Sequence, residues 1–216
     1  LEIARRLVED GYRVVIGSRD PARGEKAARA VGEGATACQL DVTDPESIEA
    51  CVSTIGERFG RLDVLVNSAG VGFGATVDEI DAKKVDLQLG VNLRSLVLFY
   101  RECAELLRTA GAEHRCALVI NLSSISGKSG QPWLSVYSAT KAAVIGFTQA
   151  MHKELGAQGI KNTALCPAFV DTPMTDFIKE QVDADKMIRP SDIAEAVRFL
   201  LHLSPNCLVP EIVFQR

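Results

Sequence analysis

Two side chains suited to acid–base chemistry stand four residues apart in the segment SVYSATKAAVIGF, whose composition favours a helix. Residues at this spacing lie on one helix face, so Tyr137 and Lys141 would be neighbours. A phenol has a reference pKa of about 10, and a nearby ammonium group favours its ionised form. The pair could therefore donate or accept a proton near neutral pH. A Tyr and a Lys at this spacing also occur together by chance, so this pair indicates a functional site only if other segments of the sequence support it.

A hydroxyl group that could join this pair comes from the apolar segment CALVINLSS, which is expected to be a buried strand. Ser124 would lie at its carboxyl end and could donate a hydrogen bond to a carbonyl oxygen that Tyr137 protonates. Ser123 is the alternative, and the spacing to Tyr137 favours Ser124. Taken alone, two serines at a strand end would indicate only a turn.

The elements that must position these residues alternate along the whole chain. Apolar strands that are each followed by a helix indicate a parallel sheet covered on both faces. We predict one α/β domain over residues 1–216, a doubly wound parallel sheet with helices on both faces, and helix N-caps at Asp20, Asp44 and Ser191. The expected strands are residues 12–18, 35–42, 62–70, 116–124, 160–170 and 207–215, and the expected helices are 1–10, 20–32, 44–60, 81–111, 136–159 and 190–203.

Composition excludes several classes of function. The net charge of −4 argues against a nucleic-acid surface. The longest apolar runs, such as CALVI and SLVLF, are too short to span a bilayer. The six cysteines contain no CxxC pair, and the three histidines have no metal-ligand spacing. We therefore expect a cytoplasmic protein with reduced thiols, no metal site, no nucleic-acid partner and no membrane attachment.

Five segments together resemble the short-chain dehydrogenase/reductase family in their order and spacing. Each segment alone is a loose match, but five in register are specific. The resemblance covers essentially the whole chain and implies a Rossmann-like fold and an oxidoreductase that uses a nicotinamide cofactor. The segments are NSAG at residues 67–70, VNL at 91–93, NLSS at 121–124, YSATK at 137–141 and CPAFVDTPM at 166–174.

The resemblance implies a catalytic set of four residues. Tyr137 would be the general acid in reduction and the base in oxidation. Lys141 would lower the pKa of Tyr137 and bind the nicotinamide ribose, and Ser124 would orient the substrate oxygen. Asn92 resembles the family's asparagine that holds a water in a proton relay. Without the other segments, Asn92 would indicate only a polar residue in a helix kink.

The same resemblance implies cofactor contacts at the ends of the strands, in addition to Tyr137 and Lys141. The family usually has Gly after the Pro of the CPAFVDTPM segment, whereas this chain has Ala168, which could shift the loop or narrow the pocket near the nicotinamide. The implied contacts are Asp41 and Val42 beside the adenine, Asn67, Ala69 and Gly70 along the adenosine, and Pro167, Val170 and Thr172 around the nicotinamide.

The segment GSRD bears on the choice between NADP(H) and NAD(H). Relatives that bind NAD place an acidic residue at the end of this strand to accept the ribose hydroxyls. Here Ser18 holds that place and Arg19 follows, so a 2′-phosphate would meet a guanidinium rather than a carboxylate. Asp20 is interpreted as a helix N-cap, and NADP(H) is favoured over NAD(H). The alternative for Arg19 is an ordinary solvated surface charge.

The residues that follow the catalytic strand and the CPAFVDTPM segment would form an apolar substrate pocket. They suit a small to medium hydrophobic ketone, aldehyde or 3-oxoacyl compound. A core position is an equal alternative for Phe169 and Met174. The candidates are Ile125, Trp133, Phe169, Met174 and Phe177.

Both ends of the sequence depart from the family pattern. In relatives a strand and a TGxxxGxG turn precede the first helix, whereas this sequence begins with the helix at residues 1–10. We therefore expect that strand and turn to be missing from the 216 residues, and weak cofactor binding by this chain alone. Pro210 interrupts the last segment, which in many relatives packs between subunits. A homodimer through the long helices around Asn92 and Tyr137 is expected, with a tetramer as the alternative.

The sequence thus predicts an NADP(H)-dependent oxidoreductase that interconverts a carbonyl and an alcohol by hydride transfer, with a small-molecule substrate. Two alternatives stay open. One is an NAD-dependent alcohol dehydrogenase of the same family. The other is a non-catalytic, cofactor-sensing or dimer-forming protein on the same fold.

Overall fold

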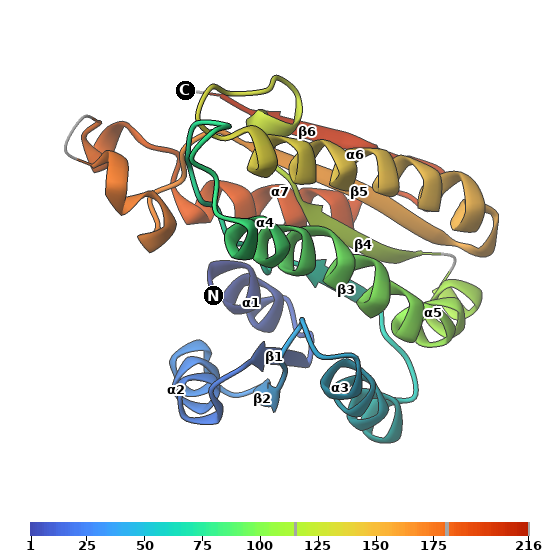
Figure 1. The fold of residues 1–216 in the computed structure, drawn as a ribbon. Helices are drawn as coiled ribbons and strands as arrows, with labels where there is room; N and C mark the ends of the chain where they lie inside the picture. The colour runs from blue at the N-terminus through green and yellow to red at the C-terminus, as the bar shows by residue number, and fades with distance from the viewer. Residues whose placement is uncertain (115, 180–181, 216) are drawn as a thin grey trace.

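Helices and strands alternate from end to end in the computed structural model, which describes residues 1–114, 116–179 and 182–215 (Figure 1). The strands are β1 (Val14–Ser18), β2 (Ala35–Gln39), β3 (Val64–Asn67), β4 (Ala117–Leu122), β5 (Ile160–Pro167) and β6 (Glu211–Phe214). The α-helices are α1 (Glu2–Glu9), α2 (Pro21–Val31), α3 (Pro45–Phe59), α4 (Ala82–Leu89), α5 (Ser95–His114), α6 (Ser135–Leu155) and α7 (Pro190–His202). A π-helical turn, η1 (Gly90–Arg94), joins α4 to α5, and short 3₁₀ turns are η2 (Ile125–Gly127), η3 (Gly156–Gln158), η4 (Pro173–Ile178) and η5 (Ala184–Lys186).

All of the strand pairs are parallel, as predicted, but they form two sheets rather than one. The strands β3, β4, β5 and β6 lie side by side in this order, and β1 pairs only with β2. Side chains rather than backbone hydrogen bonds join the two sheets. Val14 of β1 packs against the same apolar cluster as Val64 and Val66 of β3. The predicted α/β class with a parallel arrangement and helices on both faces is confirmed.

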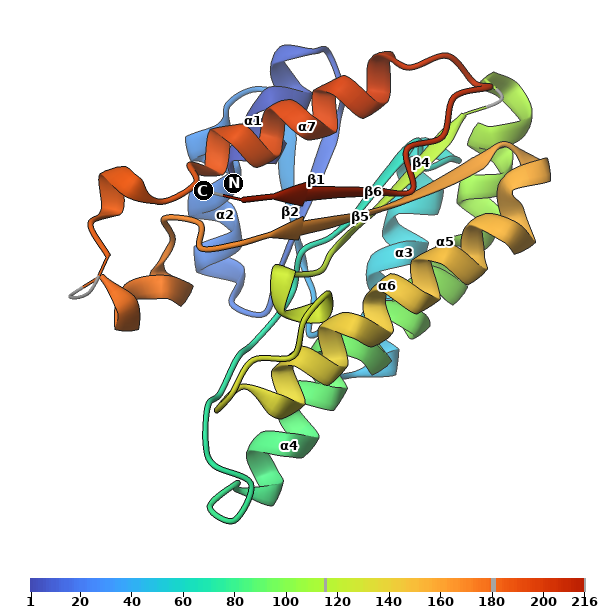
Figure 2. The ribbon, with the colours of Figure 1, turned by 90° about the horizontal axis from the view of Figure 1, so that it is seen from above.

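The alternation of side chains along β4 divides the core into two halves. Leu118 and Ile120 point to the cluster formed with α1 and α7, and Ala117 and Val119 point to the cluster formed with α3, α5 and α6. Successive residues of a strand face opposite sides, so one fully buried strand serves both layers. Figure 2 shows α1 and α7 on one side of the strands and α3, α5 and α6 on the other.

The helix starts follow local capping chemistry. The Asp20 carboxylate accepts hydrogen bonds from the first turn of α2, and the Asp44 carboxylate does the same for α3, as predicted. The expected cap at Ser191 is wrong. Arg189 is the N-cap of α7 with Pro190 as first helical residue, and the Asp192 carboxylate accepts a 2.9 Å hydrogen bond from the backbone N–H of Arg189.

The remaining boundaries differ from expectation where prolines and the helix register intervene. Strand β5 ends at Pro167, and Val170 beyond it makes only an isolated bridge to Ile188. Strand β6 begins directly after Pro210, which lacks a donor for the sheet. The helix expected over residues 81–111 contains the π-helical turn at Gly90–Arg94. None of the helices in the described ranges is long and apolar enough to cross a membrane.

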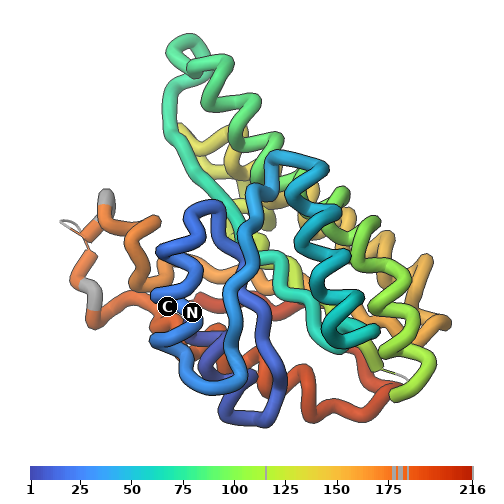
Figure 3. Tube along the Cα trace, turned by 90° about the horizontal axis from the view of Figure 1, so that it is seen from below, coloured from blue at the N-terminus to red at the C-terminus, as the bar shows by residue number. Residues whose placement is uncertain are grey.

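The segment that leads from β3 into α4 projects from the body of the molecule (Figure 3). Its backbone is irregular from Ser68 to Val77, and Val77 is 85% exposed. Loops of this kind usually carry binding residues on a rigid scaffold.

A core substitution tests the packing of α5. Leu107 is fully buried among α3, α5 and α6, so Leu107→Ala should lower the free energy of unfolding by about 2–5 kcal/mol, through lost burial and a cavity. Urea denaturation followed by circular dichroism measures this. The matched control, Val77→Ala at an exposed position, should stay within about 0.5 kcal/mol of the wild type. Equal losses in the two variants would contradict this packing.

Candidate active site

The first feature of the site is the pair of Tyr137 and Lys141 on α6. The Lys141 side chain is 5% exposed, and its Nζ atom donates a 2.8 Å hydrogen bond to the carbonyl oxygen of Leu122 at the end of β4. The same Nζ atom lies 5.7 Å from the centre of the Tyr137 ring. The pair therefore sits at the carboxyl edge of the four-stranded sheet, where ligands bind in folds of this class.

Burial sets the direction of both pKa values. Loss of hydration lowers the pKa of Lys141 to about 8, and the Cys166 thiol acts in the opposite direction. Loss of hydration raises the pKa of Tyr137, and a hydrogen bond with Ser124 opposes that rise. The lowering of the Tyr137 pKa that we expected from Lys141 is therefore not the net result in this structure, because desolvation of the phenol is the larger effect.

Ser124 lies where its hydroxyl can share a ligand atom with Tyr137. It follows β4, is 8% exposed, and interacts with the Tyr137 hydroxyl. Its Oγ atom is 3.5 Å from the carbonyl oxygen of Pro167 and accepts a 3.1 Å hydrogen bond from the backbone N–H of Ser126. The first of these bonds is long, so the hydroxyl proton is weakly held and can turn to another acceptor.

Ser123 has a different position and holds the turn after β4 against α6. Its Oγ atom donates a 2.7 Å hydrogen bond to the backbone carbonyl of Lys141. Gly127 completes this contact, since a Cβ atom there would lie 2.6 Å from the carbonyl carbon of Lys141. Only a glycine allows this approach of two backbones. The structure therefore brings Ser124, and not Ser123, to the phenol.

Asn92 lies in the π-helical turn and ties three elements together. It is 2% exposed, and its Oδ1 atom accepts a 2.8 Å hydrogen bond from the backbone N–H of Val71. Its Nδ2 atom donates to the carbonyl of Val71 at 2.8 Å and to Thr140 Oγ1 at 3.1 Å. Thr140 Oγ1 in turn donates to the backbone carbonyl of Tyr137. π-helical turns occur often at functional sites, and here the turn directs an amide toward α6.

Gln88 is a site residue that sequence reasoning missed. It is fully buried on α4, one turn before Asn92, and its Oε1 atom accepts a 3.1 Å hydrogen bond from the backbone N–H of Phe73. Gln88 and Asn92 thus hold alternate residues of one loop, Val71 and Phe73. The signal was an amide four residues before Asn92 on the same helix.

The glycines on either side of Val71 lie against Tyr137 and Lys141. A Cβ atom at Gly70 would lie 3.4 Å from Lys141 Nζ, and one at Gly72 would lie 3.3 Å from Tyr137 Cδ2. The loop therefore forms a close wall beside both side chains. The alternating pattern GVGFG at residues 70–74 was visible in the sequence, but only its first glycine was assigned to the site.

Asn67 is held by the sheet and α6. Its Nδ2 atom donates a 2.8 Å hydrogen bond to Oδ1 of Asn121 on β4, and Asn121 Nδ2 donates to Thr148 Oγ1 on α6 at 2.9 Å. This buried chain fixes the carboxyl end of β3, from which Ala69 and Gly70 lead into the loop. Ala69 is exposed and Gly70 is half-buried.

A second group of predicted residues lies on the β1–β2 pair, around a surface hollow of about 340 Å³ lined by Ser18, Arg19, Asp20 and Arg23. The Asp20 carboxylate accepts hydrogen bonds from Ala22 N and Arg23 N, so it caps α2 as expected. Within the described ranges, the guanidinium groups of Arg19 and Arg23 have no carboxylate within ion-pair distance. Ser18 Oγ donates a 2.8 Å hydrogen bond to the carbonyl of Asp20, so the two arginines are the groups that fit an anionic phosphate, and Arg23 was not anticipated from the sequence.

Asp41 and Val42 follow β2, the strand that pairs with β1. The Asp41 Oδ1 atom accepts hydrogen bonds from Thr43 N at 2.9 Å and Thr43 Oγ1 at 2.7 Å. These bonds, with a smaller effect of Arg19, lower the pKa of Asp41. Val42 is half-buried. The carboxylate is therefore fixed by its own turn, and the charge of Arg19 acts on it.

The segment after β5 forms an ordered turn near Ser124. Thr175 Oγ1 donates a 2.7 Å hydrogen bond to the carbonyl of Val170, and Thr172 Oγ1 lies 3.4 Å from the same oxygen. Ala168, the departure from the family pattern, donates its backbone N–H to Phe214 on β6. The turn is therefore anchored at both ends.

The candidate pocket residues are placed less uniformly. Ile125 and Phe169 are half-buried, and Met174 is 49% exposed. Trp133 is 55% exposed, and its carbonyl accepts a 2.9 Å hydrogen bond from Ala75 N, so the loops after β3 and β4 meet (Figure 2). The Phe177 side chain lies outside the described part of the structure.

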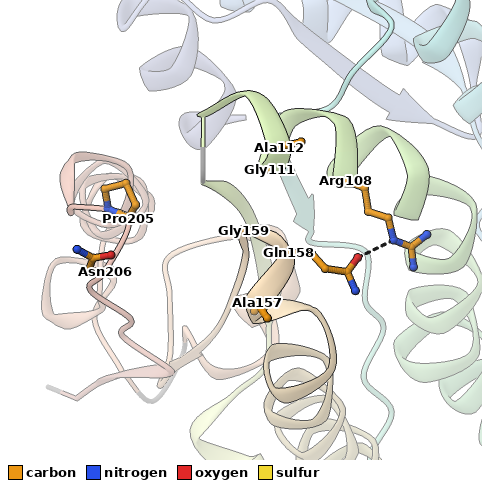
Figure 4. Close-up of a pocket in the computed structure, with 9 residues that line it drawn as sticks. Arg108, Gly111, Ala112, Ala157, Gln158, Gly159, Pro205 and Asn206 are labelled. Carbon is orange, nitrogen blue, oxygen red and sulfur yellow. Dashed lines mark hydrogen bonds between the residues drawn. The ribbon is translucent and has the colours of Figure 1, made fainter.

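A further hollow of about 630 Å³ lies at the opposite end of the sheet (Figure 4). It is bordered by the end of α5, the turn η3 and the loop after α7, and Arg108 Nε donates a 2.8 Å hydrogen bond to Gln158 Oε1 across it. Since Gly159 precedes β5, this hollow is at the amino end of the strands and is separate from Tyr137.

Comparisons with known proteins agree with this geometry. The family model described as short chain dehydrogenase matches residues 1–183. A protein of Streptomyces coelicolor provisionally named a ketoacyl reductase is 35% identical, over 93% of this chain and 85% of that protein. A 3-alpha-(or 20-beta)-hydroxysteroid dehydrogenase of Mycobacterium tuberculosis is 33% identical, over 94% of this chain and 76% of that protein. The crystal structure of 3-ketoacyl-(acyl-carrier-protein) reductase from Brucella melitensis complexed with NADH superposes with a TM-score of 0.88 at 29% identity, over 98% of this chain and 90% of that one.

The buried ammonium group gives a testable pH dependence. Burial lowers the pKa of Lys141 to about 8 in the folded chain, whereas an unfolded chain holds it near about 10.4, so the unfolded state binds more protons between these values. The free energy of unfolding should therefore rise with pH across this window, relative to Lys141→Met, by on the order of 3 kcal/mol. Urea denaturation from about pH 7 to about pH 10.5 measures the difference.

Lys153→Met, at an exposed position on the same helix, is the matched control and should follow the wild type across the pH range. If the curves of the wild type and Lys141→Met run parallel, the lysine is not desolvated as described.

Proposed function

The chain belongs to the short chain dehydrogenase family, and on this premise we propose that it is an NADP(H)-dependent oxidoreductase that interconverts a carbonyl and an alcohol. The observation that carries the proposal is the meeting of Tyr137, Ser124 and Lys141 at the carboxyl edge of the sheet. Each comes from a different stretch of the fold or a different helical turn; Ser124 and Lys141 are buried and Tyr137 is half-buried. A surface role needs no such arrangement.

In the proposed reaction Tyr137 carries the proton. Its hydroxyl would protonate the carbonyl oxygen in reduction and take the proton back in oxidation. Ser124 would donate its hydroxyl proton to the same oxygen, which its weak 3.5 Å bond to Pro167 allows. The raised pKa of Tyr137 keeps the phenol protonated at neutral pH, which suits an acid in the reductive direction.

Lys141 and Asn92 would prepare the site for that proton transfer. The Lys141 ammonium group lies on the phenol side of the helix and would favour the phenolate as it forms. Asn92 would hold the start of a proton relay, and its bonds to Val71 and Thr140 fix its amide beside α6. Both side chains are buried, so their geometry requires no reorganisation during the reaction.

The residues present fit a nicotinamide cofactor. The hollow with Arg19 and Arg23 offers a phosphate two guanidinium groups, which supports NADP(H) over NAD(H). The absence of side chains at Gly70 and Gly72 lets the loop backbone pack closely beside Lys141 and Tyr137, which supports a narrow site around the two side chains. Asp41, Val42, Asn67 and Ala69 would line the adenosine, and Pro167, Val170 and Thr172 the nicotinamide. When bound, the nicotinamide ring would supply or accept the hydride.

For the substrate we propose a small to medium hydrophobic ketone, aldehyde or 3-oxoacyl compound. Ketoacyl reductases among the similar proteins support the last of these. Exposed apolar side chains after β4 and β5, Trp133 and Met174, support an apolar pocket in this chain. An NAD-dependent alcohol dehydrogenase is the second candidate, supported by the similar reductase that was crystallised with NADH.

We also propose that the protein forms a homodimer through its long helices. Leu87 and Leu89 on α4 and Val97 on α5 are each about two-fifths exposed. Exposed large apolar side chains on these two successive helices support an association surface.

A substitution of Tyr137 tests whether this residue is the acid. Tyr137→Phe should lower kcat/KM for NADPH-dependent reduction of a hydrophobic ketone by about 10²–10⁴-fold while leaving cofactor affinity near that of the wild type, because only a proton donor is lost. Steady-state kinetics and a cofactor titration measure the two effects.

Tyr12→Phe is the matched control. Tyr12 is a half-buried tyrosine whose pKa is also raised by burial, and it lies outside the site, so turnover should be unchanged. Near-normal turnover in Tyr137→Phe would rule out its assignment as the acid and favour the non-catalytic alternative.

The second prediction concerns the cofactor. Arg19→Ala combined with Arg23→Ala should weaken NADPH binding by about tenfold or more and leave NADH binding unchanged, since only a 2′-phosphate uses these donors. Arg13→Ala, an exposed arginine outside the hollow, is the control. Equal effects on the two cofactors would contradict the NADP(H) preference.

A further inference from the structure

Trp133 has an unusual backbone conformation. Its φ angle is +67°, and among the described residues no other residue except glycine has a positive φ. A bulky side chain in the left-handed region is a genuine outlier and persists only where the surroundings enforce it. Trp133 lies four residues before Tyr137, in the turn that leads into α6.

The loop after β3 supplies the contact that holds this residue. The backbone N–H of Ala75 donates a 2.9 Å hydrogen bond to the carbonyl of Trp133. A Cβ atom built at Gly74 would lie closer than 3.0 Å to Cε3, Cζ3 and Cδ2 of the indole. These are consecutive atoms of the six-membered ring at nearly equal distances, so Gly74 lies against a face of the indole and not against its edge.

The same loop continues toward the catalytic residues with alternating sides. Gly72 lies against the Tyr137 ring, and Gly74 lies against Trp133. The residues that alternate with these glycines are bound by side-chain amides: Val71 by Asn92 of η1, and Phe73 by Gln88 of α4. The Tyr137 ring and the indole therefore lie against glycines that are two residues apart in one loop.

The face of the indole away from Gly74 is available to a ligand. Trp133 is 55% exposed although one ring face is covered, so most of the remaining exposure belongs to the other face and the ring edge. Exposure of an indole that is held by Gly74 and by a strained backbone does not stabilise the fold, so it favours a role in binding. An aromatic ring that stacks on this face would lie with its centroid about 4.5–7 Å from that of the indole.

We propose that Trp133, backed by Gly74, is a stacking surface that makes the site prefer carbonyl substrates with a planar ring beside the carbonyl group over substrates with a saturated group there. The inference rests on the proposed function, because it takes Tyr137 as the group that meets the carbonyl oxygen. It narrows the proposed hydrophobic substrate to aryl or conjugated cyclic ketones and aldehydes.

A matched pair of ketones tests the preference. Acetophenone and cyclohexyl methyl ketone differ in the planarity of a six-carbon ring. The ratio of the kcat/KM value for acetophenone to that for the cyclohexyl compound should fall about 3- to 10-fold in Trp133→Leu, because the aryl compound loses more contact. Gly74→Ala should produce the same fall, because its methyl group forces the ring away. Gly130→Ala is the control, because Gly130 lies in the loop that carries Trp133 and a Cβ atom there would have no atom within 4 Å. It should leave both kcat/KM values unchanged.

A binding measurement separates this inference from the activity. The chain has one tryptophan, so its fluorescence reports on this ring alone. Benzamide, which the reaction does not consume, should give a saturable change in emission, and cyclohexanecarboxamide should not. The change should disappear in Gly74→Ala.

Three results have distinct meanings. Equal losses for both ketones in Trp133→Leu, or equal fluorescence responses to both amides, would overturn the ring preference and leave the carbonyl reductase intact. Ring-selective fluorescence with no turnover of either ketone would support the stacking surface and count against the proposed function. A selective fall in both Trp133→Leu and Gly74→Ala would support both.

Discussion

The contact between the turn after β4 and the backbone of α6 determines the geometry of the site. Ser123 binds the carbonyl of Lys141, and Gly127 brings two backbones to a separation that no side chain would permit. The strand end and the helix are therefore fixed to each other at one point. Ser124 and Tyr137 meet because each is covalently close to that point, and the Lys141 ammonium group reaches back to the carbonyl of Leu122.

The same close packing governs the electrostatics. Removing water favours the neutral form of every group it covers, so it moves the pKa of Lys141 down and that of Tyr137 up. Without a ligand the site therefore resists charge separation. A group that restores hydrogen bonds or charge in the site would act on both residues at once. The spacing of Tyr137 and Lys141 along the helix does not show how much water each side chain loses. The sequence therefore does not predict the direction in which the pKa of Tyr137 moves.

Local sequence patterns predicted most of the fold and the set of candidate residues. Asp followed by Pro defined the starts of α2 and α3, and apolar strands ending in polar residues located the carboxyl edge. Features that depend on contacts between distant segments were not predictable in this way. Gln88 binds the backbone of Phe73, fifteen residues earlier in the chain. Arg23 shares a hollow with Arg19 because α2 begins at Pro21, directly after the turn that holds Arg19. The separation of β1 and β2 from the larger sheet is likewise a matter of which edges pair.

The loop from Gly70 to Gly74 has a consequence for the way the chain can change. Surface loops usually accept insertions and deletions. Here one side of the loop backbone is bound at Val71 and Phe73, and the other side presents glycines to two aromatic rings and a lysine. Adding or removing one residue would exchange the two sides, as a register slip does in a strand. The loop can therefore vary in sequence at its tip, while its length between β3 and the tip is as constrained as that of a core strand.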